Sequence, residues 1–485
     1  MKQYLLDGFE PQNVLRHFED ICSIPHGSGH EAALRSHIAA LADRYGLAHR
    51  EIGGGNLLVR VPASPGCEEA APFLIQGHMD MVLAKEPRVE LDLEHEPIRL
   101  VLEGGVLRAD GTTLGADNAV GLCHMMAMME PSAPRHPELE LLFTTEEEVG
   151  LVGIRKADLS AIRSRRMLNM DCGDPDVLVI GAAGGSKYDL TASFPLAATD
   201  DPGLCVEIAG LRGGHSGIEA GKRASSVELA GRLLSALCDE APIRLGAMET
   251  PAATNGFPRW QKLFLSVPEA CLDGVRRALD RIIADFHREL DEREPEFRVT
   301  VTDQTVARAA SAEDTRTLAD FLLLMPFGVS QRSPDHPAWV LCSALLANAS
   351  FDGGVFHGHF SIRANREPYR QAVVARLEAL CRMTGFRAAL KDRPSPPWPE
   401  KDASPLRELC QALSREVLGQ EMAIQVENGS VEVGVITLAI PDMDAVGFAP
   451  KSRGAHTTSE HLYLDTMPTF WTLFTALLDR LCDLP

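Results

Sequence analysis

Long hydrophobic runs and basic residues are scarce in this chain of 485 residues. No apolar stretch approaches the roughly 18 residues that a membrane helix needs, so we expect no membrane-spanning segment. Lysine and arginine number 47 against 68 aspartates and glutamates, which gives a formal net charge of −21. Because an acidic protein repels nucleic acid and anionic membrane surfaces, we expect neither of them as a partner.

Paired cysteine motifs are also missing. The 11 cysteines are scattered from Cys22 to Cys482, their number is odd, and no Cys-x-x-Cys pair occurs. This pattern favours free thiols in a reducing compartment over a disulfide framework. The first ten residues lack the basic-then-apolar layout of a signal peptide. We therefore expect a cytoplasmic protein.

Hydrophobic residues make up 45% of the chain, enough for large cores, and the length predicts two or three domains. In the first 190 residues, apolar runs of strand length alternate with helical patterns. This alternation predicts an α/β domain with a twisted, mostly parallel sheet flanked by helices. The expected strands are 57–61, 73–76, 139–145 and 167–170, and the expected helices are 13–22, 31–45 and 118–129.

The character of the sequence changes near residue 190. Ligand-type motifs stop there, and long helical patterns such as 226–237 and 270–286 take their place. A proline-dense stretch at 393–399 is typical of a rigid connector, and helix and strand patterns resume after it. We therefore predict one catalytic domain in two pieces, 1–190 and 393–485, interrupted by an inserted α+β domain at 191–392.

Acidic and histidine side chains stand where the predicted strands end, and strand ends are where an open α/β sheet gathers its active site. Each motif alone has an ordinary explanation, such as a helix N-cap, a solvated acidic run or a surface histidine. Together they would give each of two metal ions about three ligands, with one carboxylate shared and a position left open for water. The motifs are Gly77-His78-Met79-Asp80, Gly115-Ala116-Asp117-Asn118, Glu146-Glu147-Glu148-Val149-Gly150, Asn169-Met170-Asp171 and Gly454-Ala455-His456.

Two of these motifs suggest supporting roles. Residues two apart in a strand face the same side, so Asp80 could orient a metal-bound His78. A glutamate of the triple run that lies outside the metal's ligand shell could act as general base. Mixed nitrogen and oxygen ligands suit Zn²⁺, Co²⁺ or Mn²⁺.

On these motifs the chain resembles the co-catalytic zinc peptidase family that contains carnosinases, acylamino-acid deacylases and succinyl-diaminopimelate desuccinylase. The resemblance covers essentially the full length, from residue 21 to the C-terminal helix. It implies the fold of that family, with the inserted domain as a lid and dimerisation domain. It also implies two divalent metal ions, with zinc expected, and a cis peptide after the shared aspartate. The implied ligands are His78 and Asp171 for one ion, Glu148 and His456 for the other, and Asp117 between them; Asp80 would orient His78, and Glu147 would be the general base.

The resemblance extends to the inserted domain. Its Gly213-Gly214-His215-Ser216-Gly217 matches a motif whose histidine contacts the substrate carbonyl. Asn255 and Arg363 match substrate-binding positions, and Arg363 is suited to grip a peptide carboxylate. Glu432 is a candidate for binding a free amino terminus.

The implied activity is hydrolysis of unblocked dipeptides by a metal-bridging water that Glu147 activates. One alternative is deacylation of N-acyl amino acids by the same site. A second alternative is a non-catalytic binding protein that keeps the fold, which would have lost a ligand or the base; every one of these residues is present. The expected partners are a small peptide substrate and a second copy of the chain, joined through the lid domain.

Overall fold

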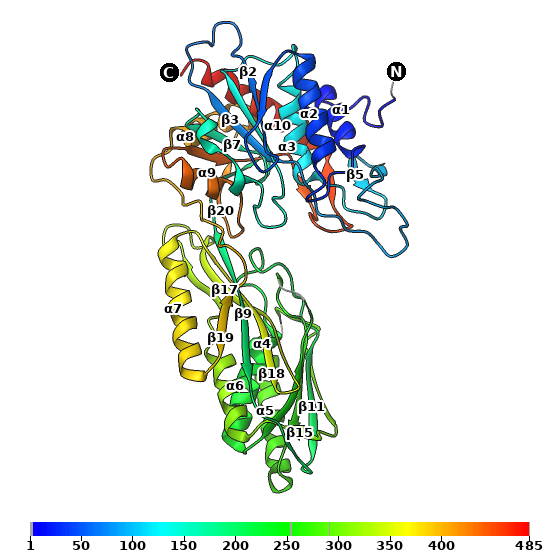
Figure 1. Cartoon of the computed structure of the whole chain (residues 1–485), viewed down its shortest axis with the longest axis vertical. Helices are drawn as coiled ribbons and strands as arrows, with labels where there is room; N and C mark the ends of the chain where they lie inside the picture. The colour runs from blue at the N-terminus through cyan, green and yellow to red at the C-terminus, as the bar shows by residue number, and fades with distance from the viewer. Residues whose placement is uncertain (1–2, 253–254, 291, 485) are drawn as a thin grey trace. The chain divides into compact units, whose positions relative to one another are not determined.

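The computed structural model describes residues 3–252, 255–290 and 292–484, and they form two compact units (Figure 1). The first unit comprises Met1–Ala182, Trp398–Glu427 and Val431–Pro485. The second comprises Ala183–Pro397 and Asn428–Ser430. The expected boundary at residue 190 is wrong in position, because it would cut strand β9 (Gly184–Ser193), which lies wholly in the second unit. The end of the ligand motifs, on which that boundary was based, does not coincide with the end of the domain.

The first unit is built on an eight-stranded sheet. Strand β3 runs parallel to β6 and β7, β21 runs parallel to β7, and β20 runs parallel to β8. The prediction of a mostly parallel sheet in an α/β fold is therefore confirmed. In spatial order the strands are β1 (Ala48–Glu51), β2 (Leu57–Val61), β6 (Leu139–Thr144), β3 (Phe73–His78), β7 (Arg166–Asn169), β21 (Asp444–Gly447), β8 (Val177–Ala182) and β20 (Ala423–Glu427).

Helices cover both faces of this sheet (Figure 1). Alternate strand residues such as Leu74 and Leu142 pack with Val433 and Ile436 of α9. Helix α3 packs against β3 and α1, and α10 packs on α8. These helices are α1 (Gln12–Cys22), α2 (Ala32–Arg44), α3 (Ala116–Ala127), α8 (Pro405–Leu418), α9 (Val433–Ala439) and α10 (Met467–Leu481), with short 3₁₀ turns at Ile154–Lys156, Leu159–Ala161 and Leu464–Thr466.

A small antiparallel sheet in the first unit holds the loop of the last histidine motif. Its strands, in order, are β22 (Ser452–Arg453), β23 (His461–Tyr463), β5 (Val106–Ala109) and β4 (Leu100–Glu103). The chain between β22 and β23 contains His456, whose φ of 66° lies in the left-handed region. The two short strands thus fix both ends of the loop that carries this residue.

One disulfide bond joins Cys67 to Cys482, across a sequence separation of 415 residues. The expectation of free thiols is wrong for this pair, because their proximity arises from the tertiary fold rather than from a local motif. Every other cysteine is described and free.

The second unit is an α+β structure with its own apolar core. Its nine-stranded antiparallel sheet is covered by helices. None of the helices that the structure describes, in either unit, has the length and hydrophobicity that crossing a membrane requires. The strand order is β14 (Arg298–Asp303), β11 (Gly203–Ala209), β13 (Gln261–Ser266), β12 (Arg244–Glu249), β17 (Val340–Asp352), β18 (Val355–Ala364), β9 and β19 (Arg387–Leu390), with β16 (Gly328–Arg332) paired to β17 and a separate pair of β10 (Ala197–Ala198) and β15 (Arg308–Ala309). The helices are α4 (Ser226–Glu240), α5 (Leu272–Leu290), α6 (Ala312–Leu324) and α7 (Glu367–Thr384), with a 3₁₀ turn at Glu269–Cys271.

Candidate metal centre

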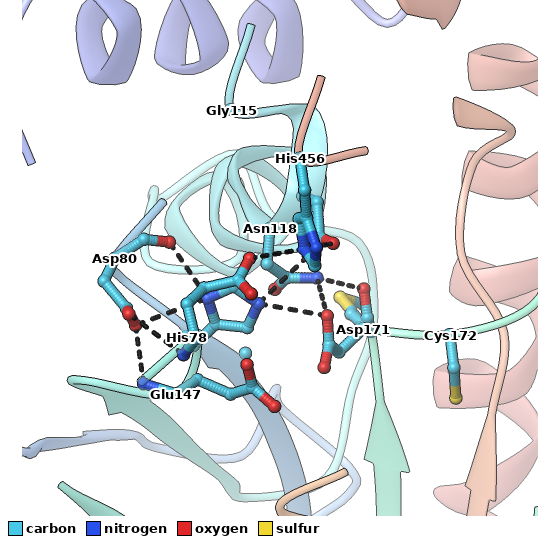
Figure 2. A network of polar contacts seen from close by, with 12 residues as sticks. His78, Asp80, Gly115, Asn118, Glu147, Asp171, Cys172 and His456 are labelled. Atoms are coloured by element: carbon cyan, nitrogen blue, oxygen red, sulfur yellow. Dashed lines mark hydrogen bonds and ion pairs between the residues drawn. The ribbon is translucent and has the colours of Figure 1, made fainter. Parts of the chain in front are cut away.

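The carboxyl ends of three neighbouring strands meet at one edge of the first unit's sheet (Figure 2). His78 is the last residue of β3, and Asp171 follows β7 by two residues. Glu147 and Glu148 lie just beyond β6. Because β3 runs parallel to both neighbours, these side chains are delivered to the same place, as expected for an α/β active site.

Asp117 stands between two imidazoles. Its Oδ1 lies 3.0 Å from Nε2 of His78, and its Oδ2 lies 3.3 Å from Nε2 of His456. Asp171 Oδ1 is 3.1 Å from the first of these nitrogens, and Glu148 Oε1 is 2.9 Å from the second. One carboxylate therefore belongs to two groups that could each hold a cation, and this is the donor arrangement that a shared, bridging ligand requires.

The orientation of His78 leaves Nε2 directed at these carboxylates. Its Nδ1 lies 3.0 Å from the backbone carbonyl of Asp80 and 3.5 Å from that residue's carboxylate. We assign a proton to Nδ1, which donates to the carbonyl. Nε2 is therefore the nitrogen that would bind a cation, once it has lost its own proton. Asp80 thus contacts His78 more closely through its main chain than through its side chain.

The carboxylate of Asp80 instead fixes the backbone of Glu147 and Glu148. It accepts hydrogen bonds from the backbone N–H groups of Glu147 at 2.9 Å and Glu148 at 3.1 Å, and from the hydroxyl of Ser28 at 2.7 Å. One buried side chain thereby fixes the residue expected to act as base and the residue expected to bind metal.

The three adjacent glutamates point to different partners. Glu147 and Glu148 form a possible metal-binding group with His78, whereas the carboxylate of Glu146 lies 3.1 Å from Nζ of Lys156. Glu146 has a φ of 50°, and its N–H donates to Glu31 at 2.9 Å. The chain turns at Glu146, which separates its side chain from the other two.

Burial and charge shift the pKa values of the centre's residues in opposite directions. Burial lowers the pKa of His78, but Asp171 and Asp117 more than offset this and raise it well above its usual range. Hydrogen bonds to Asp117 and Glu148 raise the pKa of His456 to about 11. Burial raises the pKa of Asp171 to about 7, with Asp117 adding to the effect. The buried site contains more carboxylates than imidazoles, and a divalent cation suits such a set of donors.

Cation binding should therefore strengthen as pH rises. With a pKa of about 11, His456 carries a proton at neutral pH in the metal-free protein, and that proton must leave before the nitrogen can bind a cation. We expect apparent Zn²⁺ affinity to rise by at least about tenfold per pH unit between pH 6 and 8, one proton being released per imidazole. A competition titration against a chromophoric chelator measures this slope, and an affinity independent of pH would contradict the assignment of His78 and His456 as ligands.

Glu432 is buried beside Gln76 of β3 and Thr144 of β6. Its carboxylate accepts hydrogen bonds from Gln76 at 2.5 Å and from the hydroxyl of Thr144, and Asn169 donates to Gln76 at 2.6 Å. Burial raises the pKa of Glu432 to about 8. With 0% of its surface exposed, binding of a substrate amine by Glu432 stays a prediction.

In the second unit, His215 and Arg363 lie against each other. Nη2 of Arg363 is 3.3 Å from Nε2 of His215, and its Nε donates to the hydroxyl of Ser216 at 3.2 Å. Burial lowers the pKa of Arg363 to about 10, which leaves the guanidinium charged at neutral pH. Asn255 is exposed, and its backbone carbonyl accepts from the N–H of Ser216. The three predicted residues of the second unit thus share one neighbourhood.

Some supporting residues were missed by the reasoning from sequence. The carboxylate of Glu294 accepts from the N–H of Arg212 at 2.7 Å and of Ala224 at 3.2 Å, which closes the base of the loop that carries His215. The carboxylate of Glu460 likewise accepts hydrogen bonds from backbone N–H groups of the segment that carries Asp117. Glu460 follows His456 by four residues, which was a usable signal; nothing in the sequence marks Glu294.

The chain is similar to known peptidases over almost its whole length. The family model described as Peptidase family M20/M25/M40 matches residues 74–480. The cytosol non-specific dipeptidase of Escherichia coli (strain K12) is 27% identical over 482 residues, covering 98% of this chain and 99% of the relative. The crystal structure of aminoacylhistidine dipeptidase from Vibrio alginolyticus is 26% identical with a TM-score of 0.88, covering 99% of this chain and 98% of that one.

A more distant structure shares the fold alone. Human carnosine dipeptidase 1 is 14% identical with a TM-score of 0.52, covering 97% of each chain. The family model accounts for well over half of the sequence and includes every residue of the metal centre, from His78 to His456. The chain therefore belongs to Peptidase family M20/M25/M40.

Proposed function

We propose that this chain is a metallo-dipeptidase that hydrolyses unblocked dipeptides, of the Xaa-His type and more broadly, with two divalent ions of which zinc is the expected metal. The observation that carries the proposal is the position of Asp117, whose two oxygens face two separate histidine–carboxylate pairs. His78 and Asp171 would hold one ion, and Glu148 and His456 the other. Bound there, the ions would supply Lewis acidity for the scissile carbonyl and lower the pKa of a water molecule.

Glu147 is the residue that moves protons. Burial raises its pKa well above the usual range, with Asp171 and Glu148 adding to the shift and His78 opposing it. A carboxylate of raised basicity can take a proton from the attacking water near neutral pH and return it to the leaving amine. Asp80 keeps it in place through the hydrogen bond to its N–H.

Substrate contacts are assigned to the second unit. His215 would stabilise the developing oxyanion, Arg363 would bind the substrate's carboxylate, and Asn255 would add a polar contact. The second unit would also provide the homodimer contact. Cytoplasmic location is proposed from the Escherichia coli relative, which is named as a cytosol enzyme.

Substrate choice separates the dipeptidase from the alternative deacylase. The Escherichia coli and Vibrio alginolyticus relatives are both named as dipeptidases, which favours the dipeptidase. The test is a hydrolysis assay of free dipeptides and the matching N-acetyl amino acids, with zinc, cobalt or manganese added. Cleavage of the free dipeptides supports the proposal, and cleavage of the N-acetyl compounds alone would replace it with the deacylase.

The Arg363 assignment makes a separate prediction. Its planar fork suits a carboxylate in a way that a lysine ammonium does not, so we expect Arg363→Lys to lower kcat/KM on dipeptides by about 10- to 100-fold. The effect should come mainly through KM. Dipeptide amides, which lack the carboxylate, are the matched control and should be hydrolysed by both proteins at similar rates. An equal loss on both substrates would contradict the carboxylate contact.

A further inference from the structure

We propose that Glu460 is a positioning residue that fixes the shared ligand Asp117 and joins its segment to the loop of His456. Glu460 lies outside both groups of candidate ligands in the described structure. The inference rests on the metal centre of the proposed function, and it assigns to a residue outside that centre the task of holding its central ligand.

The contacts of Glu460 converge on the start of helix α3. Its Oε2 accepts hydrogen bonds from the backbone N–H groups of Leu114 at 2.8 Å and Gly115 at 2.9 Å. Its Oε1 accepts from the N–H of Asp117 itself at 3.2 Å. The residue is only 2% exposed. All three donors belong to the four residues that deliver the Asp117 side chain.

This arrangement fixes a backbone that would otherwise be poorly held. Gly115 has a φ of 71°, and a Cβ there would lie 2.7 Å from Sδ of Met81, so the turn into the helix is tight. The ordinary α-helical pattern leaves the first N–H groups without partners. A charged acceptor satisfies them more strongly than a neutral one. Holding the N–H of Asp117 sets the peptide plane from which its carboxylate projects.

Glu460 is also the end of the His456 loop. Its own N–H donates to the carbonyl of Thr457 at 3.1 Å, and the N–H of Thr457 donates to the carbonyl of Gly454 at 3.2 Å. The next residue, His461, begins β23. The buried carboxylate of Glu460 thus joins the loop of His456 to the segment of Asp117. In the sequence, 343 residues separate Glu460 from Asp117.

A purely structural carboxylate would stabilise the fold without affecting cation binding. Glu140 offers that comparison, because it is equally buried and accepts from the N–H groups of Arg163 and Ser164 at 2.9 Å each. It lies in β6 four residues before Thr144, about 13 Å along the strand from the ligand edge. Glu140→Gln and Glu460→Gln are therefore the same chemical change, made away from the centre and beside it.

The test is a competition titration of Zn²⁺ into the metal-free full-length chain, with thermal unfolding measured on the same samples. Residues that orient metal ligands commonly contribute 10- to 100-fold in affinity. We expect Glu460→Gln to weaken Zn²⁺ binding by about that factor, while Glu140→Gln lowers the melting temperature and leaves the affinity within twofold of wild type. Glu460→Asp, which keeps the charge but shortens the reach, should lose less affinity and serves if the glutamine variant does not fold.

The outcomes separate this inference from the function on which it rests. Wild-type affinity in folded Glu460→Gln or Glu460→Asp would overturn the positioning role and leave the metal centre intact. Asp117→Asn is the positive control, since it changes the shared ligand directly. A wild type that binds no divalent ion, or whose binding Asp117→Asn does not weaken, would overturn the centre and this inference with it.

Discussion

Glu147→Gln is expected to lower kcat for dipeptide hydrolysis by about 10³-fold, within the range of a general acid–base group, while both metal ions stay bound. The amide keeps the shape of the side chain but cannot take a proton from water or return one to the leaving amine. The backbone N–H that Asp80 holds is unchanged, so the turn should keep its form.

Metal content separates the role of a base from that of a ligand. Elemental analysis of Glu147→Gln should give the same number of ions per chain as wild type, and KM should change little. Glu146→Gln is the matched control, because Glu146 faces Lys156 and should retain full activity. Loss of an ion from Glu147→Gln would make Glu147 a ligand, and retained activity would remove it from the mechanism.

The second large effect is expected at Asp117. In Asp117→Asn one oxygen is replaced by an NH₂ group and the negative charge is lost, yet both histidine–carboxylate pairs need an oxygen of this residue. We expect binding of both ions to weaken and kcat/KM to fall by more than about 10³-fold, since each ion contributes several kcal/mol to stabilising the transition state.

A ligand of one pair gives the contrast. His456→Ala should lose the ion shared with Glu148 and keep the ion at His78, because only Asp117 is common to the two groups. Stoichiometry measured at a fixed low concentration of free Zn²⁺ distinguishes the two variants. An Asp117→Asn protein that retains one ion at wild-type affinity would show that this carboxylate serves a single site.

The sequence predicted the sheet and the ligands because both leave local signals. Apolar runs of strand length ending in His78 or before Asp171 mark buried strands and their carboxyl ends, where parallel strands must meet. The family resemblance then supplied the register within the glutamate run. The structure places Glu147 and Glu148 with His78 and turns Glu146 away, and a positive φ at Glu146 is the physical reason.

Features that depend on distant contacts could not be predicted in this way. The Cys67–Cys482 bond and the hydrogen bonds of Glu460 to Leu114 and Gly115 join segments that are hundreds of residues apart. In the sequence, a buried glutamate that accepts hydrogen bonds from backbone N–H groups, such as Glu294, cannot be distinguished from a solvated glutamate. Its role follows from burial and partners, which only the fold defines.

The measurement that tests the central claim most directly is anomalous diffraction at the zinc edge from crystals of the zinc-loaded protein. Two peaks about 3.5–4 Å apart are expected, one on each side of the Asp117 carboxylate, with His78 and Asp171 at one and Glu148 and His456 at the other. A single peak, or two peaks that do not share Asp117, would contradict the bridged centre.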